Sequence, residues 1–360
     1  MTNLLYEVLA EFRTGEGSIV MESLHDGLIN DTYKVTIGNN EKYILQRINT
    51  SVFKQPELIL ENISLIGSFL LNQSPEYIFT NPITTITGKS LVYKGDGECY
   101  RLMPYIDDSV TYNVLCDESF AASAAEQFGL FTKKLEFFDA DQLNITIPDF
   151  HNLSMRYQQY ADVLNNGNRQ KIDACKDIID AMDSYKWIVE DYEKILDNPA
   201  FKKRVTHHDT KISNVLFNSD GKGICVIDLD TVMPGYFISD LGDMMRTYLC
   251  EVTEEAQDFS LIAIRPSYFK AVVRGYLKQM ASILTDTEKR YIVYAGAFMI
   301  YMQALRFFTD YLNDDQYYGA KYPGHNLVRA KNQLRLLESY HGNNDLLNEI
   351  VREVITDFDS

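Results

Sequence analysis

The chain has 360 residues, of which 46% are apolar and 12% aromatic, so it is long enough for two domains or lobes, each with its own core. A net charge of −17 argues against a protein that binds DNA or RNA through a basic surface. The five cysteines, at positions 99, 116, 175, 225 and 250, are dispersed, which is typical of reduced thiols in a reducing compartment.

No stretch of the sequence predicts export or membrane insertion. The N-terminal residues include Glu7 and Glu11 and lack the basic region and cleavage site of a signal peptide. The longest apolar stretch, residues 291–305, contains Gln303 and ends at Arg306, short of the ~20 residues that a membrane span needs. We therefore expect a cytoplasmic protein with no membrane partner, either a monomer or a weak homodimer.

The first hundred residues predict a small antiparallel sheet with a helix across it. In chain order we expect a helix over 3–12, strands over 18–24, 31–37 and 41–48, a helix over 56–71, and a hairpin over 91–102. These elements alternate between short apolar runs and turn residues, as antiparallel sheets do.

The loop between the first two strands is a candidate for binding nucleotide phosphates. Its backbone N–H groups could approach phosphate oxygens, although the segment has no G-x-G-x-x-G pattern and is equally typical of a plain hairpin. From this hairpin, Gly27, Asn30 and Thr32 are cofactor-binding candidates. At the exit of the later hairpin, Met103 and Tyr105 predict either an inter-lobe hinge that meets adenine or an ordinary strand end.

The catalytic candidates lie together between residues 204 and 243. Asp209, Lys211 and Asn214 precede a predicted β-hairpin, and Asp228 follows it, so the hairpin brings both ends together. The spacing H-x-D-x-x-x-x-N, then a strand and an aspartate, is the kinase catalytic-loop pattern. In that chemistry Asp209 accepts a proton from a hydroxyl and Lys211 offsets phosphoryl charge. Asn214 and Asp228 would hold Mg²⁺.

From residue 117 onward the apolar spacing is mainly helical. We expect helices over 117–137, 155–164, 170–196, 239–250, 266–283, 285–312, 326–341 and 345–358. The helix from Thr285 begins at a sequence that resembles a capping box, and its all-round apolar surface predicts a buried position. Arg306 on that helix needs a negatively charged or ligand oxygen, and Asp310, one turn later, is one candidate.

Four stretches carry a family resemblance: residues 207–214, 227–231, 239–243 and 321–329. Together they resemble the aminoglycoside phosphotransferase/choline kinase superfamily, and the last stretch resembles its N-acetylhexosamine 1-kinases. The resemblance implies an α+β, two-lobed, protein-kinase-like fold. Residues 1–105 would form a nucleotide-binding lobe with an antiparallel sheet, and residues 106–360 a mainly helical catalytic and acceptor-binding lobe.

The resemblance also implies a reaction and roles for further residues. The γ-phosphoryl group of ATP, bound with Mg²⁺, would pass to the anomeric hydroxyl of N-acetylglucosamine or N-acetylgalactosamine, with Asp209, Arg306 and Tyr317 binding the sugar. Asp240 would hold the catalytic loop by its backbone N–H groups, unless it caps the following helix, and His207 would orient that loop. At position 46, where relatives have a phosphate-binding lysine or arginine, this chain has a glutamine. Either Gln46 binds the phosphates without a charge, or the adjacent Arg47 replaces the missing cation.

Three other interpretations remain open. Residues 224–232 also fit the nucleophile loop of haloacid-dehalogenase-type phosphatases, with Asp228 as nucleophile and Asp230 as acid/base. That fold requires further strands of a parallel sheet, whereas everything beyond Val232 is expected to be helical. A catalytically inactive kinase fold used for binding is the second interpretation. The third keeps the chemistry but takes an aminoglycoside, choline, homoserine or another sugar as acceptor.

Overall fold

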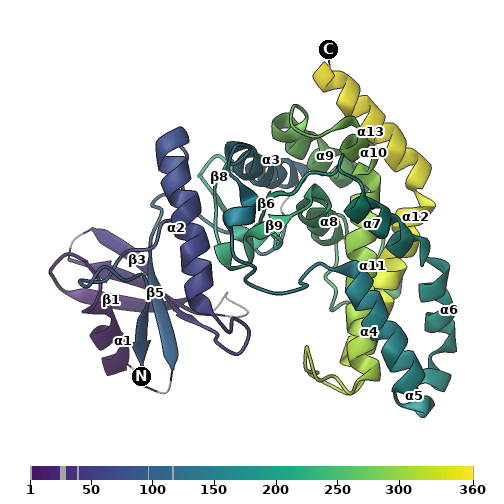
Figure 1. Ribbon diagram of the computed structural model, residues 1–360, viewed down its shortest axis with the longest axis horizontal. Coiled ribbons are helices and arrows are strands. Elements are labelled where there is room, and N and C mark those ends of the chain that lie inside the picture. Colours follow the sequence, from purple (N-terminus) through teal and green to yellow (C-terminus); the bar gives the residue numbers. More distant parts are fainter. Residues whose placement is uncertain (1, 25–29, 39, 96, 116, 360) are drawn as a thin grey trace.

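The computed structural model describes residues 2–24, 30–38, 40–95, 97–115 and 117–359. An antiparallel sheet near the N-terminus is followed by a mainly helical region (Figure 1). This is the α+β class that the sequence predicts. The boundary expected after residue 105 falls one residue beyond the last strand of the sheet, which ends at Pro104.

The N-terminal sheet has the spatial order β1-β2-β3-β5-β4, and every neighbouring pair is antiparallel. The strands are β1 (Ile19–Leu24), β2 (Asp31–Ile37), β3 (Glu41–Ile48), β4 (Val92–Lys94) and β5 (Glu98–Pro104). Val35, Leu45 and Leu102 form a small core with helix α1 (Thr2–Leu9). In the pairing of β3 with β5, Gln46 lies opposite Arg101.

Helix α2 (Pro56–Gln73) lies between the sheet and the helical region (Figure 1). Proline suits its first turn, where a backbone N–H would have no partner within the helix. The buried apolar side chains of α2 belong to the main core, which continues through the helical region. Asn62, fully buried on α2, donates hydrogen bonds to the carbonyl oxygens of Val232 (3.0 Å) and Asn144 (2.9 Å). These contacts attach α2 to the catalytic segment.

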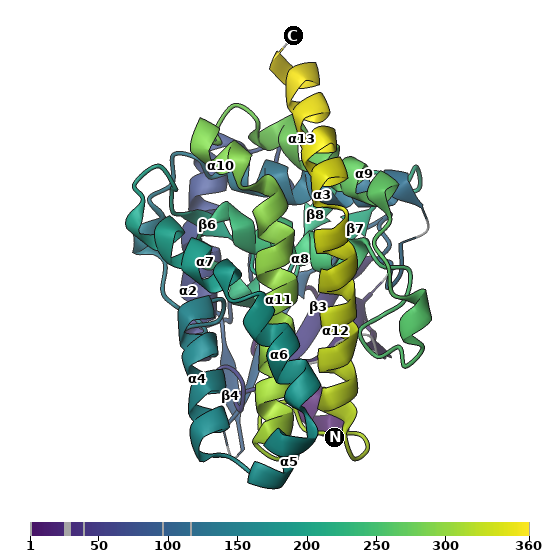
Figure 2. The same ribbon diagram turned by 90° about the vertical axis from the view of Figure 1, so that its right-hand side faces the viewer.

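The helical region is built around α11, which contacts α4, α7, α8, α12 and α13 (Figure 2). The helices are α3 (Glu118–Lys134), α4 (Leu153–Asn166), α5 (Arg169–Ala174), α6 (Lys176–Ser184), α7 (Trp187–Asp197), α8 (Phe237–Tyr248), α9 (Pro266–Met280), α10 (Asp286–Arg290), α11 (Ile292–Leu312), α12 (His325–Gly342) and α13 (Asn344–Asp359). Helices α8 and α11 approach closely at Gly242, where a Cβ atom would lie 2.3 Å from the Ala295 carbonyl oxygen.

Helix α11 is longer than the apolar stretch seen in the sequence. Within the described part of the chain it is the one helix whose length and composition would suit a membrane span. However, 89% of its most apolar window is buried inside the protein, so its apolar surface is used for packing. The capping box expected before it is confirmed: the Thr285 side chain accepts a hydrogen bond from the Glu288 N–H, and the Glu288 carboxylate accepts one from the Thr285 N–H.

Several expected elements differ in the structure. The single helix expected over 170–196 is three helices, α5 to α7, and the one expected over 285–312 is broken at Tyr291, between α10 and α11. Each of the three short helices α5 to α7 buries apolar side chains of its own in the main core. The helical expectation beyond Val232 is also wrong, because β9 (Met233–Gly235) pairs antiparallel with β6 (Arg204–Thr206). An antiparallel pair followed by helices does not provide the parallel sheet of the phosphatase alternative.

Candidate active site

The predicted catalytic residues lie on the loop after β6 and at the end of the following hairpin. That hairpin consists of β7 (Val215–Phe217) and β8 (Gly223–Val226), as expected from the sequence. The backbone N–H of Ile227 donates a hydrogen bond of 2.9 Å to the carbonyl oxygen of Asn214. Asp228, the next residue, therefore lies beside the end of the catalytic loop.

Two carboxylates of helix α8 hold the loop by its backbone. Asp240 accepts hydrogen bonds from the N–H groups of His207 (3.0 Å) and His208 (2.7 Å). Asp243 accepts one from the N–H of Thr210 (2.8 Å). The alternative that Asp240 caps the helix is wrong, because the N-cap position is Tyr236 and Asp240 lies within the first turn. Burial raises the pKa of Asp240 to about 6.

The two histidines of the loop have separate structural contacts. His207 is fully buried; its Nε2 lies 3.0 Å from the Ile227 carbonyl oxygen, and its Nδ1 accepts a hydrogen bond from the Asp209 N–H. This arrangement links the loop to the end of the hairpin. His208 has a φ of 66° and its Nδ1 lies 2.7 Å from the Ser239 hydroxyl. Burial lowers the pKa of His208 to about 3, so the ring is neutral.

Asp209 and Lys211 form an ion pair at the start of the loop. The Nζ atom of Lys211 lies 3.0 Å from Oδ2 of Asp209, and both side chains are partly accessible to solvent. Burial opposes the charged form of Lys211, but the carboxylates of Asp209, Asp228 and Asp243 outweigh it and raise the pKa of this ammonium group. The site therefore presents an accessible carboxylate beside a protonated amine, which suits proton acceptance next to a phosphoryl group.

Asn214 and Asp228 are arranged as a pair of possible metal ligands. The Asn214 amide nitrogen donates a hydrogen bond to the carbonyl oxygen of Asp209 (2.9 Å), so its amide oxygen is the atom that could bind a cation. The Asp228 side chain is exposed, yet the surrounding protein and the charges of Asp230 and Asp209 raise its pKa to about 7. This concentration of negative charge fits a divalent cation. No group of three or more His, Cys, Asp and Glu side chains in the described ranges could hold a metal, so water and phosphate oxygens would complete the coordination.

The candidates for phosphate binding gather around a residue that the sequence analysis did not single out. Gln46 donates a hydrogen bond to the Thr32 hydroxyl (3.2 Å) and accepts one from Nε of Arg101 (2.9 Å). Arg101 forms a buried ion pair with Asp230, which also accepts a hydrogen bond from Asn30 (2.9 Å). The signal in the sequence was a charged residue in the middle of β5, flanked by Cys99, Tyr100, Leu102 and Met103.

The remaining nucleotide candidates are separate from this cluster. Met103 is buried within β5, and Tyr105 follows the strand, with its N–H donating to the Lys42 carbonyl oxygen (3.3 Å). Contact of this segment with adenine stays a prediction. Gly27 lies outside the described residues.

The structure brings together the two acceptor candidates, Arg306 and Tyr317. Their side chains make a long hydrogen bond of 3.4 Å, and the guanidinium carbon of Arg306 lies 5.4–5.8 Å from the ring centroids of Phe150, Tyr317 and Tyr318. Its Nε is buried and has no hydrogen-bond partner among the residues that the structure describes. The expected partner, Asp310, instead accepts hydrogen bonds from the N–H groups of Tyr317 (2.7 Å) and Tyr318 (2.9 Å). The ion-pair alternative is therefore wrong.

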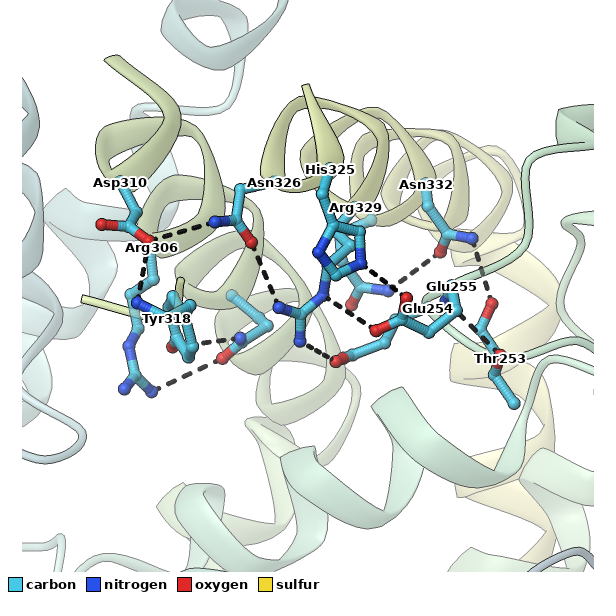
Figure 3. A network of polar contacts seen from close by, with 12 residues as sticks. Thr253, Glu254, Glu255, Arg306, Asp310, Tyr318, His325, Asn326, Arg329 and Asn332 are labelled. Carbon is cyan, nitrogen blue, oxygen red and sulfur yellow. Dashed lines mark hydrogen bonds and ion pairs between the residues drawn. The ribbon is translucent and has the colours of Figure 1, made fainter. Parts of the chain in front are cut away.

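A polar network holds the segment that carries Tyr318, the residue after Tyr317 (Figure 3). At its centre is Asn326, which is fully buried at the start of α12. Its amide nitrogen donates hydrogen bonds to Asp310 (3.1 Å), Asp315 (2.8 Å) and the carbonyl oxygen of Gly319 (2.9 Å). Asn326 thus connects the start of α12 to the end of α11 and to the loop between these two helices.

Charged residues continue this network to the catalytic loop. Arg329 donates to the Asn326 amide oxygen (3.2 Å) and pairs with Glu254 (Figure 3). Glu254 also pairs with Arg246 (2.8 Å), which in turn pairs with Asp243 (3.0 Å), the residue that holds the loop backbone. Acceptor candidates and catalytic loop are therefore joined by an unbroken series of ion pairs and hydrogen bonds.

Residues 20–280 match the phosphotransferase enzyme family. Many solved structures have a similar fold, and three of them illustrate the likeness. An aminoglycoside phosphotransferase from Alicyclobacillus acidocaldarius has a TM-score of 0.61 and 11% identity, covering 97% of this chain and 96% of that chain. An amicoumacin kinase, solved with AMP-PNP, Ca²⁺ and Ami, has a TM-score of 0.60 and 11% identity, covering 93% of each chain.

Choline kinase from Cryptosporidium parvum has a TM-score of 0.57 and 13% identity, covering 96% of this chain and 97% of that chain. At such identities the three likenesses concern the fold. They confirm the kinase-like architecture that the sequence predicts.

Proposed function

This chain belongs to the phosphotransferase enzyme family, and on that premise we propose that it transfers the γ-phosphoryl group of ATP to the anomeric hydroxyl of an N-acetylhexosamine. The products are the sugar 1-phosphate and ADP. The observation that carries the proposal is the partly accessible carboxylate of Asp209, 3.0 Å from Lys211, on a loop held by Asp240 and Asp243.

The proposed mechanism assigns one task to each side chain. Asp209 accepts the proton of the attacking hydroxyl, which is the most acidic one of a reducing sugar. Lys211 donates hydrogen bonds to the transferring phosphoryl group and offsets its charge. Asn214 and Asp228 would hold Mg²⁺, which would supply positive charge to offset that of the ATP phosphates.

Support for a sugar acceptor comes from Arg306 and Tyr317. Within the described part of the chain the buried Nε of Arg306 has no hydrogen-bond partner, which leaves a donor for a ligand oxygen. The Tyr317 side chain is 63% exposed, so its ring can contact a bound ligand. The segment 321–329, which resembles N-acetylhexosamine 1-kinases, follows directly in the chain.

The test is ADP release from purified protein with ATP and Mg²⁺ across a panel of N-acetylhexosamines, neutral hexoses, aminoglycosides, choline and homoserine. The position of the product phosphate is read by NMR. We expect a signal with N-acetylhexosamines only, at the anomeric carbon. Turnover of a different acceptor would discard the roles of Arg306 and Tyr317 but keep that of Asp209. No ADP with any acceptor, from folded protein, would favour an inactive kinase fold used for binding.

A further inference from the structure

Arg101 is an unexpected residue for the middle of a buried strand. Only 2% of its side chain is exposed, and Asp230, with which Nη1 forms an ion pair, is equally buried. The Nε atom donates a hydrogen bond of 2.9 Å to Oε1 of Gln46. Burying a guanidinium is costly unless its charge and its donors are used. The presence of the Arg101 guanidinium at this buried position therefore needs an explanation.

The ion pair connects the N-terminal sheet to the catalytic segment. Asp230 lies two residues after Asp228, the predicted metal ligand, and also accepts a hydrogen bond from Asn30. The guanidinium thus lies between the sheet face that carries Gln46 and the segment that carries Asp228. Among the residues that the structure describes, Asp230 and Gln46 occupy two of its five N–H donors.

The described cations of the neighbouring strands β2 and β3 are engaged elsewhere. Arg47, which is 42% exposed, forms ion pairs with carboxylates of β2 and β5. Lys42 pairs with Asp107, beyond the end of the sheet. The Nζ atom of Lys34 lies 4.8 Å from the centroid of the Tyr105 ring. Among the described lysines and arginines of β2, β3 and β5, Arg101 is therefore the one that forms an ion pair with the catalytic segment.

We propose that Arg101 is the cation that binds the nucleotide phosphates, supplied by β5 and oriented by Gln46 and Asp230. Kinases use a lysine of the third strand for this purpose, whereas β3 here has a neutral glutamine in register with Arg101. A cation at position 46 would lie directly opposite Arg101, and like charges opposite each other destabilise a sheet. A neutral glutamine at position 46 is therefore compatible with an arginine directly opposite it on β5. This inference rests on the proposed use of ATP.

The experiment measures binding of ATP with Mg²⁺ by titration calorimetry without any acceptor, so the identity of the acceptor does not affect it. Arg101→Met alone would leave the buried carboxylate of Asp230 without a positively charged partner. The informative variant therefore combines Arg101→Met with Asp230→Asn. We expect this double variant to fold and to bind adenosine as the unaltered protein does. We expect it to bind ATP about 10- to 100-fold more weakly, the usual effect of losing a hydrogen bond to a charged group.

Two further variants sharpen the test. Adding Gln46→Lys to the double variant returns a cation to the same face of the sheet, and we expect most of the ATP affinity to return. Arg47→Met is the matched control, because Arg47 is adjacent to Gln46 but its ion pairs lie with Asp31 and Glu98, and we expect it to bind ATP normally. Should the double variant not fold, Arg101→Gln with Asp230→Asn is a second neutral pair that makes the same comparison.

Normal ATP affinity in a folded neutral-pair variant would overturn the proposal, because Arg101 would then only neutralise Asp230. A loss of ATP affinity in Arg47→Met, with the neutral pair unaffected, would overturn it in favour of Arg47. No binding of ATP by the unaltered protein would refute the proposed use of ATP, and this inference with it. This outcome can be distinguished from a failure of the Arg101 proposal alone, because in that case the unaltered protein would still bind ATP.

Discussion

The carboxyl group of Asp209 is restrained by its surroundings more than its accessibility suggests. Its backbone N–H donates to His207, its carbonyl oxygen accepts from Asn214, and its side chain contacts Lys211. Three neighbours thus fix both the backbone and the carboxylate. A replacement of Asp209 that keeps the shape of the side chain can therefore keep these contacts, so that its effect on catalysis is measured separately from any effect on the fold.

We expect Asp209→Asn to keep the fold and to lower kcat by a factor of about 10²–10⁴, the usual contribution of a positioned base. The amide has the same shape but cannot take a proton from the acceptor. Steady-state kinetics with the acceptor found in the panel would measure the effect. Asp220→Asn, in the exposed turn of the same hairpin, is the matched control. Near-normal turnover in folded Asp209→Asn would remove Asp209 from the role of base.

His208 predicts a pH dependence of stability. Its pKa falls from 6.5 to about 3 on burial, so between these pH values the unfolded chain binds a proton that the folded chain does not. The His208 contribution to the free energy of unfolding therefore falls as the pH falls from 6.5 toward 3, by up to about 1.4 kcal/mol per pH unit. Asp240 acts in the opposite direction, since its pKa is raised to about 6 and the folded state keeps its proton longer.

A comparison of His208→Asn with the unaltered protein isolates this effect, because both keep Asp240. Asparagine tolerates the positive φ of 66° at this position and can keep a hydrogen bond to Ser239. Chemical denaturation between pH 4 and 7 would measure it. We expect the variant to lose less stability than the unaltered protein as the pH falls. Parallel curves for the two proteins would contradict a proton uptake by His208 on unfolding.

At the scale of elements, the loop between α11 and α12 depends on a few buried polar groups. Asp310 at the end of α11 accepts hydrogen bonds from the N–H groups of Tyr317 and Tyr318, and Asn326 at the start of α12 donates a hydrogen bond to Asp310. If Tyr317 binds the acceptor, the affinity for the acceptor depends on this loop.

We expect Asn326→Leu, which keeps the volume but removes the donor, to raise the KM for the acceptor about 5- to 30-fold. This range corresponds to one or two buried hydrogen bonds. The KM for ATP should stay near its normal value, because the nucleotide candidates lie on the N-terminal sheet. Asn348→Leu, at a half-buried position of α13 outside this network, is the control. Equal changes in both KM values would indicate a general structural effect and contradict a role in acceptor positioning.

At the scale of the whole molecule, the sheet and the helical region are joined by buried polar contacts as well as by the continuous core. Asn62 of α2 contacts Val232 and both the N–H and the carbonyl oxygen of Asn144. Arg101 and Asp230 make a second connection. These contacts fix the distance between the nucleotide candidates and the catalytic loop.

We expect Asn62→Ala to lower the free energy of unfolding by about 2–4 kcal/mol, since it leaves several buried backbone groups without partners. Denaturant unfolding would measure the change. Asn72→Ala is the matched control on the same helix, because Asn72 is exposed and bonds only to the Ser68 carbonyl oxygen among the described residues. A loss of less than 0.5 kcal/mol in Asn62→Ala, within the range usual for surface changes, would show that these contacts do not hold the two regions together.

Features that depend on neighbours along the chain could be predicted from the sequence alone. Strands β2 and β3 have the predicted bounds, because side-chain alternation and a turn between them define both ends. The hairpin after Asn214 and the capping box at Thr285 follow from residues only a few positions apart. The spacing of Asp209, Asn214 and Asp228 belongs to the same class, since one hairpin is enough to bring them together.

Contacts between distant segments could not be predicted in this way and are known from the three-dimensional structure. Arg101 and Asp230 are 129 positions apart, and no local pattern links a strand of the sheet to the end of a catalytic hairpin. The local helix rule paired Arg306 with Asp310, but the structure gives Asp310 to the backbone of the following loop, where two N–H groups needed a partner. Strand β9 forms because the chain returns beside β6. Such pairings follow from which buried groups meet in space, and that depends on the packing of the whole chain.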